Sequence, residues 1–162
     1  MTDPNNSLSK SAQVVQEALH AKGVTFKVVE LAASARTANE AAMAIGCDVA
    51  QIVKSLLFRI KTTNKPILIL ASGVNRVNEQ AIENEIGLQI EKADALFTRE
   101  ETGFAIGGVS PVGHKQPIDT YIDEDLLKFP ELWAAAGTPN AVFNLRSADL
   151  SRLTNGKIIS IK

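Results

Sequence analysis

A glycine-rich loop is the part of this sequence best suited to chemistry. Residues 107–114 read Gly-Gly-Val-Ser-Pro-Val-Gly-His, which packs three glycines, a proline, a serine and a histidine into eight positions. Glycine lets a ligand approach main-chain N–H groups closely, and proline stiffens the turn. Such a loop can hold a polarised oxygen without any charged side chain. The alternative is an ordinary surface turn, because Gly, Pro and Ser dominate turns.

Lys54 is the second candidate for chemistry. It lies in an expected strand over residues 52–61, and its face of that strand is otherwise apolar, with Ile52, Leu56, Phe58 and Ile60 at alternate positions. Lysine is almost never fully buried without a partner. Two interpretations follow: the stem packs while the ammonium reaches solvent, or the ammonium faces an anion or a carbonyl in a pocket.

Other polar residues give weaker signals. His114 follows the loop and can reach the same pocket as a general acid or base, or serve only the turn. Ser110 can act as a nucleophile only with a nearby base, and no Gly-x-Ser-x-Gly elbow surrounds it. The carboxylates at positions 123–125 are expected to form a solvated helix start. Trp133 and Phe129 are expected in the core or in a lid.

Length and composition indicate one globular domain spanning residues 1–162, with a flexible tail over 1–7. Hydrophobic residues make up 45% and charged residues 22%, as in soluble proteins. No apolar run approaches the roughly 20 residues that span a bilayer, so no membrane partner is expected. Cys47 is the single cysteine, which fits a reducing cytoplasm and excludes a cysteine-rich metal site. The net charge of −1 gives no global field for nucleic acid, so any such binding needs a local patch.

The hydrophobic periodicity alternates between helical and strand-like segments. Helices are expected over 8–23, 38–46, 78–86, 93–102, 123–127 and 147–153, the last with Ser147 as its cap, and Asp48 is expected to cap one further turn. Strands are expected over 24–31, 52–61, 66–72, 88–90, 118–122, 141–145 and 157–161. This order predicts an α+β fold, a single compact domain with a curved mixed β-sheet flanked by helices.

Several short runs, in order and at fitting spacing, resemble the YbaK family of aminoacyl-tRNA deacylases, which is related to the editing domain of bacterial prolyl-tRNA synthetases. The resemblance extends from about residue 24 to residue 161. Its pieces are the helix over 37–46, Val53-Lys54-Ser55-Leu56-Leu57-Phe58, Leu68-Ile69-Leu70-Ala71-Ser72-Gly73, Gly107-Gly108-Val109-Ser110-Pro111, Ile122-Asp123-Glu124, Ala136-Gly137 and Ala148-Asp149-Leu150.

The resemblance implies a free-standing editing factor that hydrolyses the ester between a wrong amino acid and the 3′ end of a tRNA. Lys54 matches the characteristic polar residue of the family's pocket. The loop of Gly107, Gly108, Val109, Ser110 and Pro111 matches the loop that offers main-chain N–H groups to the substrate. No metal or organic cofactor is implied. The implied partners are the acceptor end of a mischarged tRNA and an aminoacyl-tRNA synthetase.

The region around Gly137 bears on substrate choice. Cysteine-editing members of this type carry a serine and an aspartate there, whereas this chain has Ala135 and Val142. The difference argues against cysteine and leaves alanine, serine and threonine open. We therefore expect Gly137, Ala135, Val142 and His114 to contact the substrate.

A near-neutral chain that meets a polyanion needs a local basic rim. The expected tRNA-binding residues are Arg59, Lys61, Lys65, Arg76 and Lys115, and the alternative is that these are ordinary solubilising charges. Two other functions stay open: a non-catalytic module that binds a tRNA end or a nucleotide, and a hydrolase of small esters that acts without tRNA.

Overall fold

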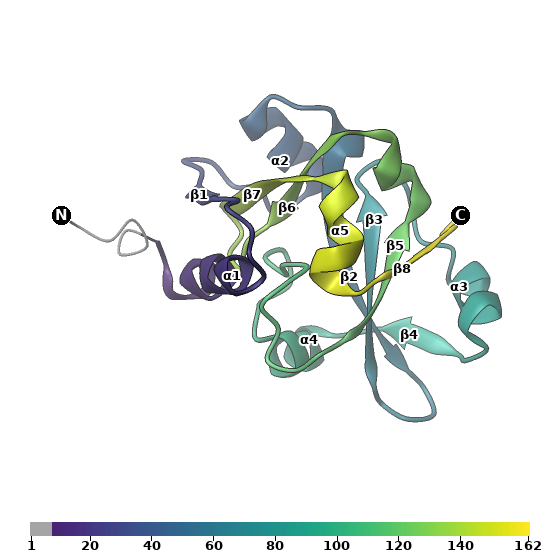
Figure 1. Cartoon of the computed structure of the whole chain (residues 1–162). Coiled ribbons are helices and arrows are strands. Elements are labelled where there is room, and N and C mark those ends of the chain that lie inside the picture. The colour runs from purple at the N-terminus through teal and green to yellow at the C-terminus, as the bar shows by residue number, and fades with distance from the viewer. Residues whose placement is uncertain (1–7) are drawn as a thin grey trace.

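The computed structural model describes residues 8–162, so the tail expected over residues 1–7 lies outside the described residues. Its helices and strands assemble into one mixed sheet with helices around it, which confirms the predicted fold class (Figure 1). Among residues 8–162, no helix combines the length and apolarity needed to cross a membrane. The helices are α1 (Lys10–Ala21), α2 (Ala38–Ile45), α3 (Glu79–Ile86), α4 (Ala95–Thr102) and α5 (Ser147–Thr154), and the strands are β1 (Val28–Glu30), β2 (Ile52–Ile60), β3 (Pro66–Ser72), β4 (Ile90–Lys92), β5 (Asp119–Asp123), β6 (Glu131–Ala135), β7 (Ala141–Arg146) and β8 (Lys157–Ile159).

The strands are ordered β1-β7-β6-β2-β3-β5-β8, and β4 pairs with β2 outside this path. Antiparallel pairs join β2 to β3, β6 to β7 and β7 to β1. Parallel pairs join β2 to β6, β3 to β5 and β5 to β8. The parallel pairs need long connections across the sheet, and these connections carry most of the helices.

Short polar side chains begin several helices, as the sequence indicates. Thr37 Oγ1 accepts from the N–H of Glu40 at 3.1 Å at the start of α2, and Gly46 ends that helix in the left-handed region. Asp48 caps a 3-10 turn over Val49–Gln51 with a full capping box. These contacts confirm the expected helix after Thr37 and the further turn after Asp48.

Some expected boundaries were wrong. The chain reaches strand geometry at Val28 rather than at residue 24, and β4 lies two residues later than expected. Ser147 is not the cap of α5, because Arg146 occupies that position without a side-chain hydrogen bond. The short helix expected over 123–127 is present as the 3-10 helix Glu124–Lys128, with Asp123 as its N-cap.

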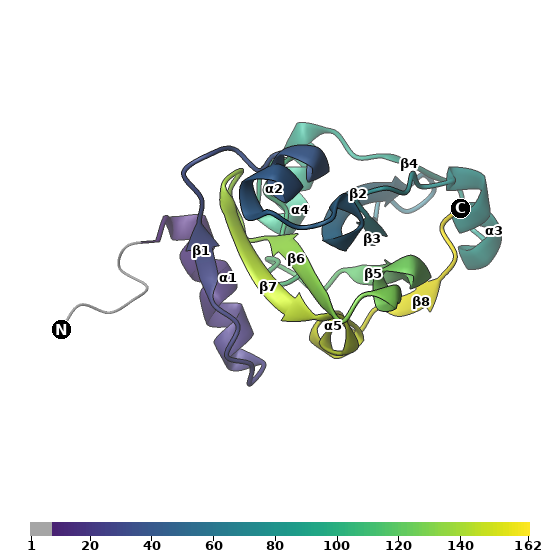
Figure 2. The ribbon, with the colours of Figure 1, turned by 90° about the horizontal axis from the view of Figure 1, so that it is seen from above.

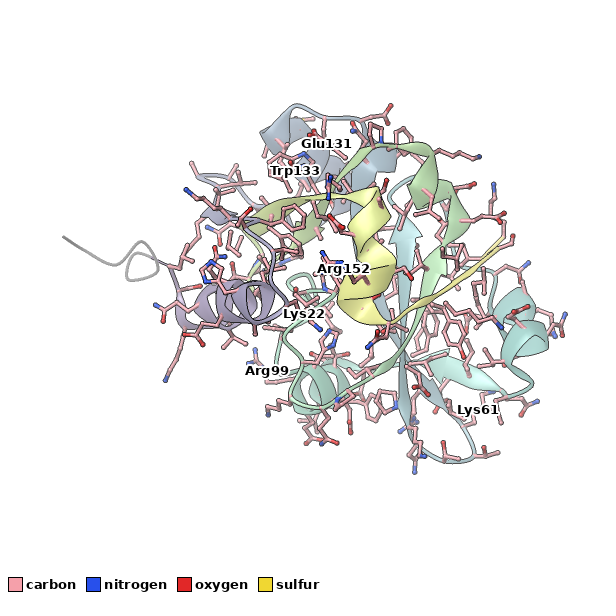
Figure 3. The ribbon with its side chains drawn as sticks, in the orientation of Figure 1. Lys22, Lys61, Arg99, Glu131, Trp133 and Arg152 are labelled. Atoms are coloured by element: carbon pink, nitrogen blue, oxygen red, sulfur yellow. The ribbon has the colours of Figure 1, made fainter. Side chains whose placement is uncertain are left out.

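The sequence did not predict β6, which spans Glu131–Ala135. Its residues, Glu-Leu-Trp-Ala-Ala, are rich in alanine, which has a weak preference for strands. The strand forms because β2 and β7 pair with it on both sides. Tertiary pairing therefore decides this segment, and Trp133 lies on a strand rather than in a lid (Figure 3).

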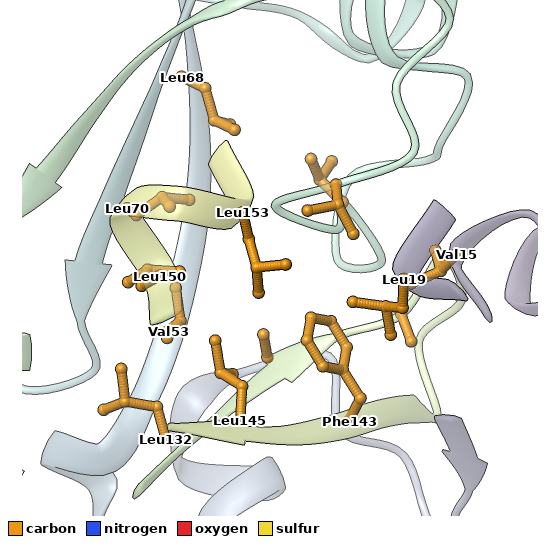
Figure 4. Close-up of a cluster of buried hydrophobic side chains, with 14 of the residues drawn as sticks. Val15, Leu19, Val53, Leu68, Leu70, Leu132, Phe143, Leu145, Leu150 and Leu153 are labelled. Atoms are coloured by element: carbon orange, nitrogen blue, oxygen red, sulfur yellow. The ribbon is translucent and has the colours of Figure 1, made fainter. Parts of the chain in front are cut away.

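Both faces of the sheet are covered. On one face, side chains of α1 and α5 pack on odd-numbered positions of β2, including Val53, together with residues of β3, β6 and β7 (Figure 4). On the other face, α2 packs against Ile52 and Val142, and α3 packs near Phe58. Figure 2 shows α2 and α5 at opposite sides of β6 and β7. Lys54 shares the second face with Ile52 and Phe58, so its charge must be accommodated inside a covered layer.

Candidate functional site

A cavity of about 840 Å³ lies between α2, the middle of β2, the β6–β7 pair and the start of the glycine-rich loop. Its size falls in the range of small-molecule sites. Most of the wall is apolar, and the polar side chains come from a few positions. The polar lining includes Arg36, Lys54, Ser55, Arg76 and Lys92. The rest of the lining includes Ile106, Gly107, Val109, Trp133, Ala135 and Val142.

The cavity reaches a gap in the sheet beside β2. Along that edge, β6 pairs only with Ile52 and Val53, whereas β4 pairs only with residues 58–60. The four residues between these pairings, 54–57, all line the cavity. A ligand in this cavity therefore meets the open edge of a central strand.

Lys54 is half-buried in this wall and has a definite partner. Its ammonium donates to the main-chain carbonyl of Asn75, in the loop that follows β3. The side chain of Asn75 in turn donates to Asp123 Oδ2 and to Asp125 Oδ2, both at 2.8 Å. A carbonyl neutralises no charge, so the ammonium keeps its charge and two of its three donors for a ligand.

Asp123 is the buried anchor of this network, with 0% of its surface exposed. Its carboxylate accepts from the N–H of Ser72 at 3.0 Å and from the N–H of Asp125 at 2.9 Å, besides Asn75. The expectation of a solvated carboxylate was therefore wrong for Asp123. Asn75 and Asp123 were both missed as neighbours of Lys54. The available signal was an acidic residue placed directly at the end of an apolar strand.

Burial is the main influence on Lys54, and it lowers the pKa of the ammonium below its ordinary value. The charge of Arg76 lowers this pKa further, whereas the charge of Asp123 raises it. Nearby, Asp125 accepts from Lys162 and Lys128 at 2.9 Å each, and these hydrogen bonds with that of Asn75 hold the pKa of Asp125 well below its usual range. The carboxylate of Asp125, behind Lys54, is thus held ionised by its own partners.

Gly107 and Val109 of the glycine-rich loop line the cavity. Gly107 has φ +92°, and a Cβ there would lie 2.7 Å from Cγ of Arg36. A Cβ on Gly108 would lie 2.9 Å from the main chain of Thr138, and the Gly108 carbonyl accepts from the N–H of Gly137 at 2.9 Å. The two glycines are therefore required by close packing on both sides of the loop.

The N–H groups of the loop are not equivalent. Gly108 donates its N–H to the carbonyl of Ala105 at 3.0 Å, so this donor is already used. No partner within residues 8–162 is found for the N–H of Gly107 or Val109. Because Gly107 and Val109 also line the cavity, their N–H groups are the loop's candidates for contact with a ligand.

The structure separates the second half of the loop from the Lys54 cavity. Ser110 is buried, and its Oγ accepts from the N–H of Val112 at 3.2 Å. His114 Nε2 donates to the carbonyl of Ser110 at 2.7 Å, and burial lowers the pKa of the imidazole. His114, Pro111 and Lys115 line a different cavity, of about 970 Å³. The expectation that His114 reaches the Lys54 pocket was therefore wrong.

Two of the residues expected to govern substrate choice do line the Lys54 cavity. Ala135 and Val142 face each other as a cross-strand pair of β6 and β7, and Trp133 lies on the same wall. Gly137 lies elsewhere: it is buried with φ +98°, and a Cβ there would lie 2.6 Å from the main-chain oxygen of Ser11. Gly137 therefore supports the loop through Gly108 rather than lining the cavity.

The expected basic residues divide into two groups. Arg76 lines the cavity, together with Arg36 and Lys92, which the sequence reading did not select. None of these three forms a salt bridge with a carboxylate of residues 8–162.

The remaining basic residues lie away from the cavity. Arg59 Nε donates to Glu91 Oε1 at 2.9 Å, and its guanidinium lies 5.6 Å from the centre of the Phe97 ring. Lys61 and Lys65 belong to the exposed end of the β2–β3 hairpin, where Figure 3 labels Lys61. Arg59 and the hairpin lysines are therefore placed for packing or solvation rather than for the cavity mouth.

The fold and the site together define a class of protein: a domain with one curved mixed sheet and one cavity. The open edge of a central strand, a half-buried lysine and a glycine-rich loop surround that cavity. Comparison with known sequences agrees, since the family described as "Aminoacyl-tRNA editing domain" matches residues 32–153. The chain belongs to this aminoacyl-tRNA editing domain family, and its activity is that of an aminoacyl-tRNA deacylase, a hydrolase.

Individual relatives support this assignment. A crystal structure described as a candidate trans-editing enzyme for prolyl-tRNA synthetase is 48% identical, with a TM-score of 0.91, covering 96% of this chain and 99% of that one. The uncharacterized protein YwhH of Bacillus subtilis is 30% identical over 81% of this chain and 83% of its own length. EbsC of Enterococcus faecalis, described as a candidate Cys-tRNA(Pro)/Cys-tRNA(Cys) deacylase, is 24% identical over 77% of this chain and 76% of its own.

Proposed function

We propose that this chain acts in trans on mischarged tRNA and hydrolyses the ester that joins a small, wrong amino acid to the tRNA 3′ end. The observation that carries the proposal is that one cavity is lined by Lys54 and by Gly107 and Val109, whose N–H groups have no main-chain partner among residues 8–162. An acyl ester that reacts with water develops negative charge on its carbonyl oxygen. Positive and N–H donors fixed in a half-buried wall stabilise that charge.

The reaction needs little more than positioning. Water attacks the carbonyl carbon, the bond to the ribose 3′ oxygen breaks, and the proton of the water passes to that departing oxygen. The products are a free amino acid and an uncharged tRNA. Because the ester is already activated, orientation and stabilisation of the oxyanion can supply most of the acceleration. Water is the nucleophile and the vicinal ribose hydroxyl relays its proton, so neither a side-chain nucleophile nor a side-chain base is required.

Ser110 does not serve as that nucleophile in this proposal. Its Oγ is buried, accepts from the N–H of Val112, and lies outside the cavity that holds Lys54. His114 donates its Nε2 proton to a main-chain carbonyl of the same turn. Both side chains therefore shape the loop, and the cavity chemistry is left to Lys54 and the main chain.

The preferred amino acid is small and lacks a requirement for a polar partner on β6 or β7. The cavity wall there consists of Ala135, Val142 and Trp133, with no ionisable side chain among them. Cysteine-editing members of the family carry a serine and an aspartate where this chain has Ala135 and Val142, which argues against cysteine and leaves alanine, serine and threonine as candidates. Pocket size alone discriminates small side chains by only about 10- to 200-fold per methylene, which is why a separate editing step is useful.

The proposed partners are the acceptor end of a tRNA and the synthetase that mischarges it, with prolyl-tRNA synthetase as the first candidate from the relatives. Arg36, Arg76 and Lys92 surround the cavity with positive charge, as a phosphate-bearing ligand requires. We also propose that residues 1–162 act as one domain, in the cytoplasm where tRNA is charged.

A panel of mischarged tRNAs tests the proposal. Purified protein is incubated with tRNA(Pro) carrying alanine, serine, threonine or cysteine, and with cognate Pro-tRNA(Pro) as the control, and the remaining aminoacyl-tRNA is measured over time. We expect loss of at least one small amino acid and retention of proline. Binding without any deacylation would indicate a non-catalytic module for tRNA ends. Equal hydrolysis of a small aminoacyl ester without tRNA would indicate a small-ester hydrolase.

A further inference from the structure

The open edge of β2 carries main-chain groups that the sheet does not use. Ile52 accepts from Gly73, and Ile60 donates to Lys65, so even-numbered residues of β2 direct their N–H and C=O groups toward β3. In a strand these directions alternate. The N–H and C=O of Ser55 therefore point to the opposite edge, between the pairings with β6 and β4.

No strand satisfies Ser55 at that edge. β6 pairs with β2 no further than Val53, and on the other side the nearest bond is from the N–H of Ala93 to the carbonyl of Leu57 at 3.2 Å. Within residues 8–162, no main-chain partner is found for the N–H or the C=O of Ser55. Buried or half-buried main-chain groups are nearly always paired with protein, water or ligand.

The cavity supplies the place where a ligand can reach these groups. Ser55 lines the cavity and is half-buried, yet its Oγ is itself buried and has no partner among the described residues. The exposed surface of Ser55 therefore belongs to its other atoms, which include the main chain. Lys54 and the Gly107 and Val109 positions line the same cavity.

We propose that the main-chain N–H and C=O of Ser55 form the subsite that holds the aminoacyl group, with the N–H donating to the ester carbonyl and the C=O accepting from the α-ammonium. An aminoacyl ester carries an amino nitrogen and a carbonyl on either side of one carbon. A strand residue offers the same two groups to its hydrogen-bonded partner in an antiparallel pair. The amino acid thus adds to β2 as a strand of one residue. This inference rests on the proposed function.

The geometry of such a pair also orients the amino-acid side chain. Directly opposite residues in an antiparallel pair place their side chains on the same face of the sheet. The side chain of the bound amino acid then lies on the face of Val53 and Leu57, where Val109 and Ala134 belong to the same apolar cluster and also line the cavity. This places the reacting carbonyl at the strand edge and the side chain against Val109 and Ala134. Trp133, Ala135 and Val142 lie on the opposite face and bound the rest of the cavity.

Two variants at one position test the subsite. Ser55→Pro removes the N–H, and proline is tolerated at strand positions whose N–H is unpaired. Ser55→Ala keeps the N–H and removes only the unpartnered hydroxyl, so it is the matched control. We expect Ser55→Pro to lower kcat/KM for the edited tRNA by about 100- to 1000-fold, as for loss of one oxyanion donor. Equal rates in Ser55→Pro and Ser55→Ala, both folded, would overturn the subsite.

A second measurement on the parent protein covers the case in which Ser55→Pro does not fold. Amide proton exchange is followed by NMR with a non-hydrolysable adenosine that carries alanine through a 3′-amide link. Binding should slow exchange at Ser55, while Arg59, on the same edge but paired with β4, stays unchanged. The analogue with lactate in place of alanine lacks the α-amine and should bind more weakly.

The outcomes separate the subsite from the proposed function. If the analogue binds and shifts the Lys54 signals while Ser55 exchanges at its free rate, the subsite is wrong and the editing function stands. Equal binding of the alanyl and lactyl analogues would reject the role of the Ser55 carbonyl. If the parent neither binds the analogue nor deacylates any mischarged tRNA, the proposed function itself fails and the subsite fails with it.

Discussion

Lys54 is placed where it weakens the fold. Its ammonium is half-buried on a face shared with Ile52 and Phe58, and the loss of hydration lowers its pKa. A lysine whose pKa is lower in the folded than in the unfolded state opposes folding wherever the side chain is charged. This penalty disappears as the pH rises through the folded pKa to the unfolded value near 10.5. A charged residue that lowers stability at neutral pH is better explained by a functional role than by a structural one. Lys54 lines the cavity, where it can contact a ligand.

Replacement of Lys54 should therefore separate activity from stability. We expect Lys54→Met to lose deacylation by about 100-fold or more, because it removes a charge that faces the substrate. The melting temperature should stay at or above that of the parent, since the methionine stem keeps the packing without a charge to bury. Thermal melts and single-turnover deacylation measure both effects. A large fall in melting temperature with normal turnover per folded molecule would instead make Lys54 structural.

The two charges that act on Lys54 should shift its pKa in opposite directions. Arg76 lowers this pKa and Asp123 raises it, while Lys92 and Glu79 also line the cavity on β4 and α3. Arg76→Gln should raise the Lys54 pKa, and Asp123→Asn should lower it. The lysine side-chain carbons are titrated by NMR in each variant. Because Asp123 also holds Ser72 and Asn75, amide spectra must first show that Asp123→Asn keeps the native fold. Shifts of the same sign in both variants would contradict this account.

At the scale of elements, the second half of the glycine-rich loop behaves as a small structural unit. Ser110 and His114 bond to each other and to their own turn, and Phe104 meets the His114 ring edge-on with centroids 6.3 Å apart. The Ser110 carbonyl accepts a hydrogen bond from Nε2–H of His114, and burial lowers the pKa of the imidazole. Both features favour the neutral form of the ring in the folded protein. The loop is thereby made sensitive to acid.

This arrangement predicts a loss of stability at low pH. A histidine whose folded pKa is depressed contributes stability that is fully present above its unfolded pKa, near 6.5, and is lost as the pH falls through the folded pKa. We expect the melting temperature of the parent to fall more between pH 7.5 and pH 5 than that of His114→Gln. Deacylation at pH 7.5 should be retained by the variant, because the ring lies outside the Lys54 cavity. Parallel melting curves for the two proteins would reject the role of His114 in acid sensitivity.

The elements that could be predicted from the sequence are those with local signals. Thr37 and Asp48 start their helical turns through contacts two or three residues away, and the β3 strand has the predicted bounds of 66–72. β6 could not be predicted, because its alanines carry no strand preference and its pairing partners lie far away in the sequence. The side of β2 on which Lys54 lies could likewise be predicted, because side chains alternate between the two faces along a strand. Its partner was not, since a main-chain carbonyl 21 residues away has no residue type to read.

At the scale of the whole molecule, the charge lining the cavity differs in sign from the net charge of the chain. The chain has a net charge of −1, yet among residues 8–162 the cavity is lined by the cations Arg36, Lys54, Arg76 and Lys92 and by a single carboxylate, that of Glu79. Several cations elsewhere are paired with carboxylates: Arg59 pairs with Glu91, and Asp149 accepts from Arg146 and Arg152. The four cations of the cavity therefore form a local positive cluster, which can attract an anion although the chain as a whole is close to neutral.

This distribution predicts which residues set the salt dependence of tRNA binding. Each cation that contacts a phosphate of a single-stranded end should add about 0.7 to the slope of log affinity against log salt. We expect Arg36→Gln, Arg76→Gln and Lys92→Gln each to lower the affinity and to flatten the slope by up to that amount. Lys61→Gln and Lys65→Gln, at the far end of the β2–β3 hairpin, are the matched control and should change the slope little (Figure 3). Fluorescence titrations of labelled tRNA between about 50 and 200 mM salt measure all five variants. If the hairpin lysines carried the slope and the cavity cations did not, the tRNA would approach from the hairpin, and the cavity charges would act on the aminoacyl end alone.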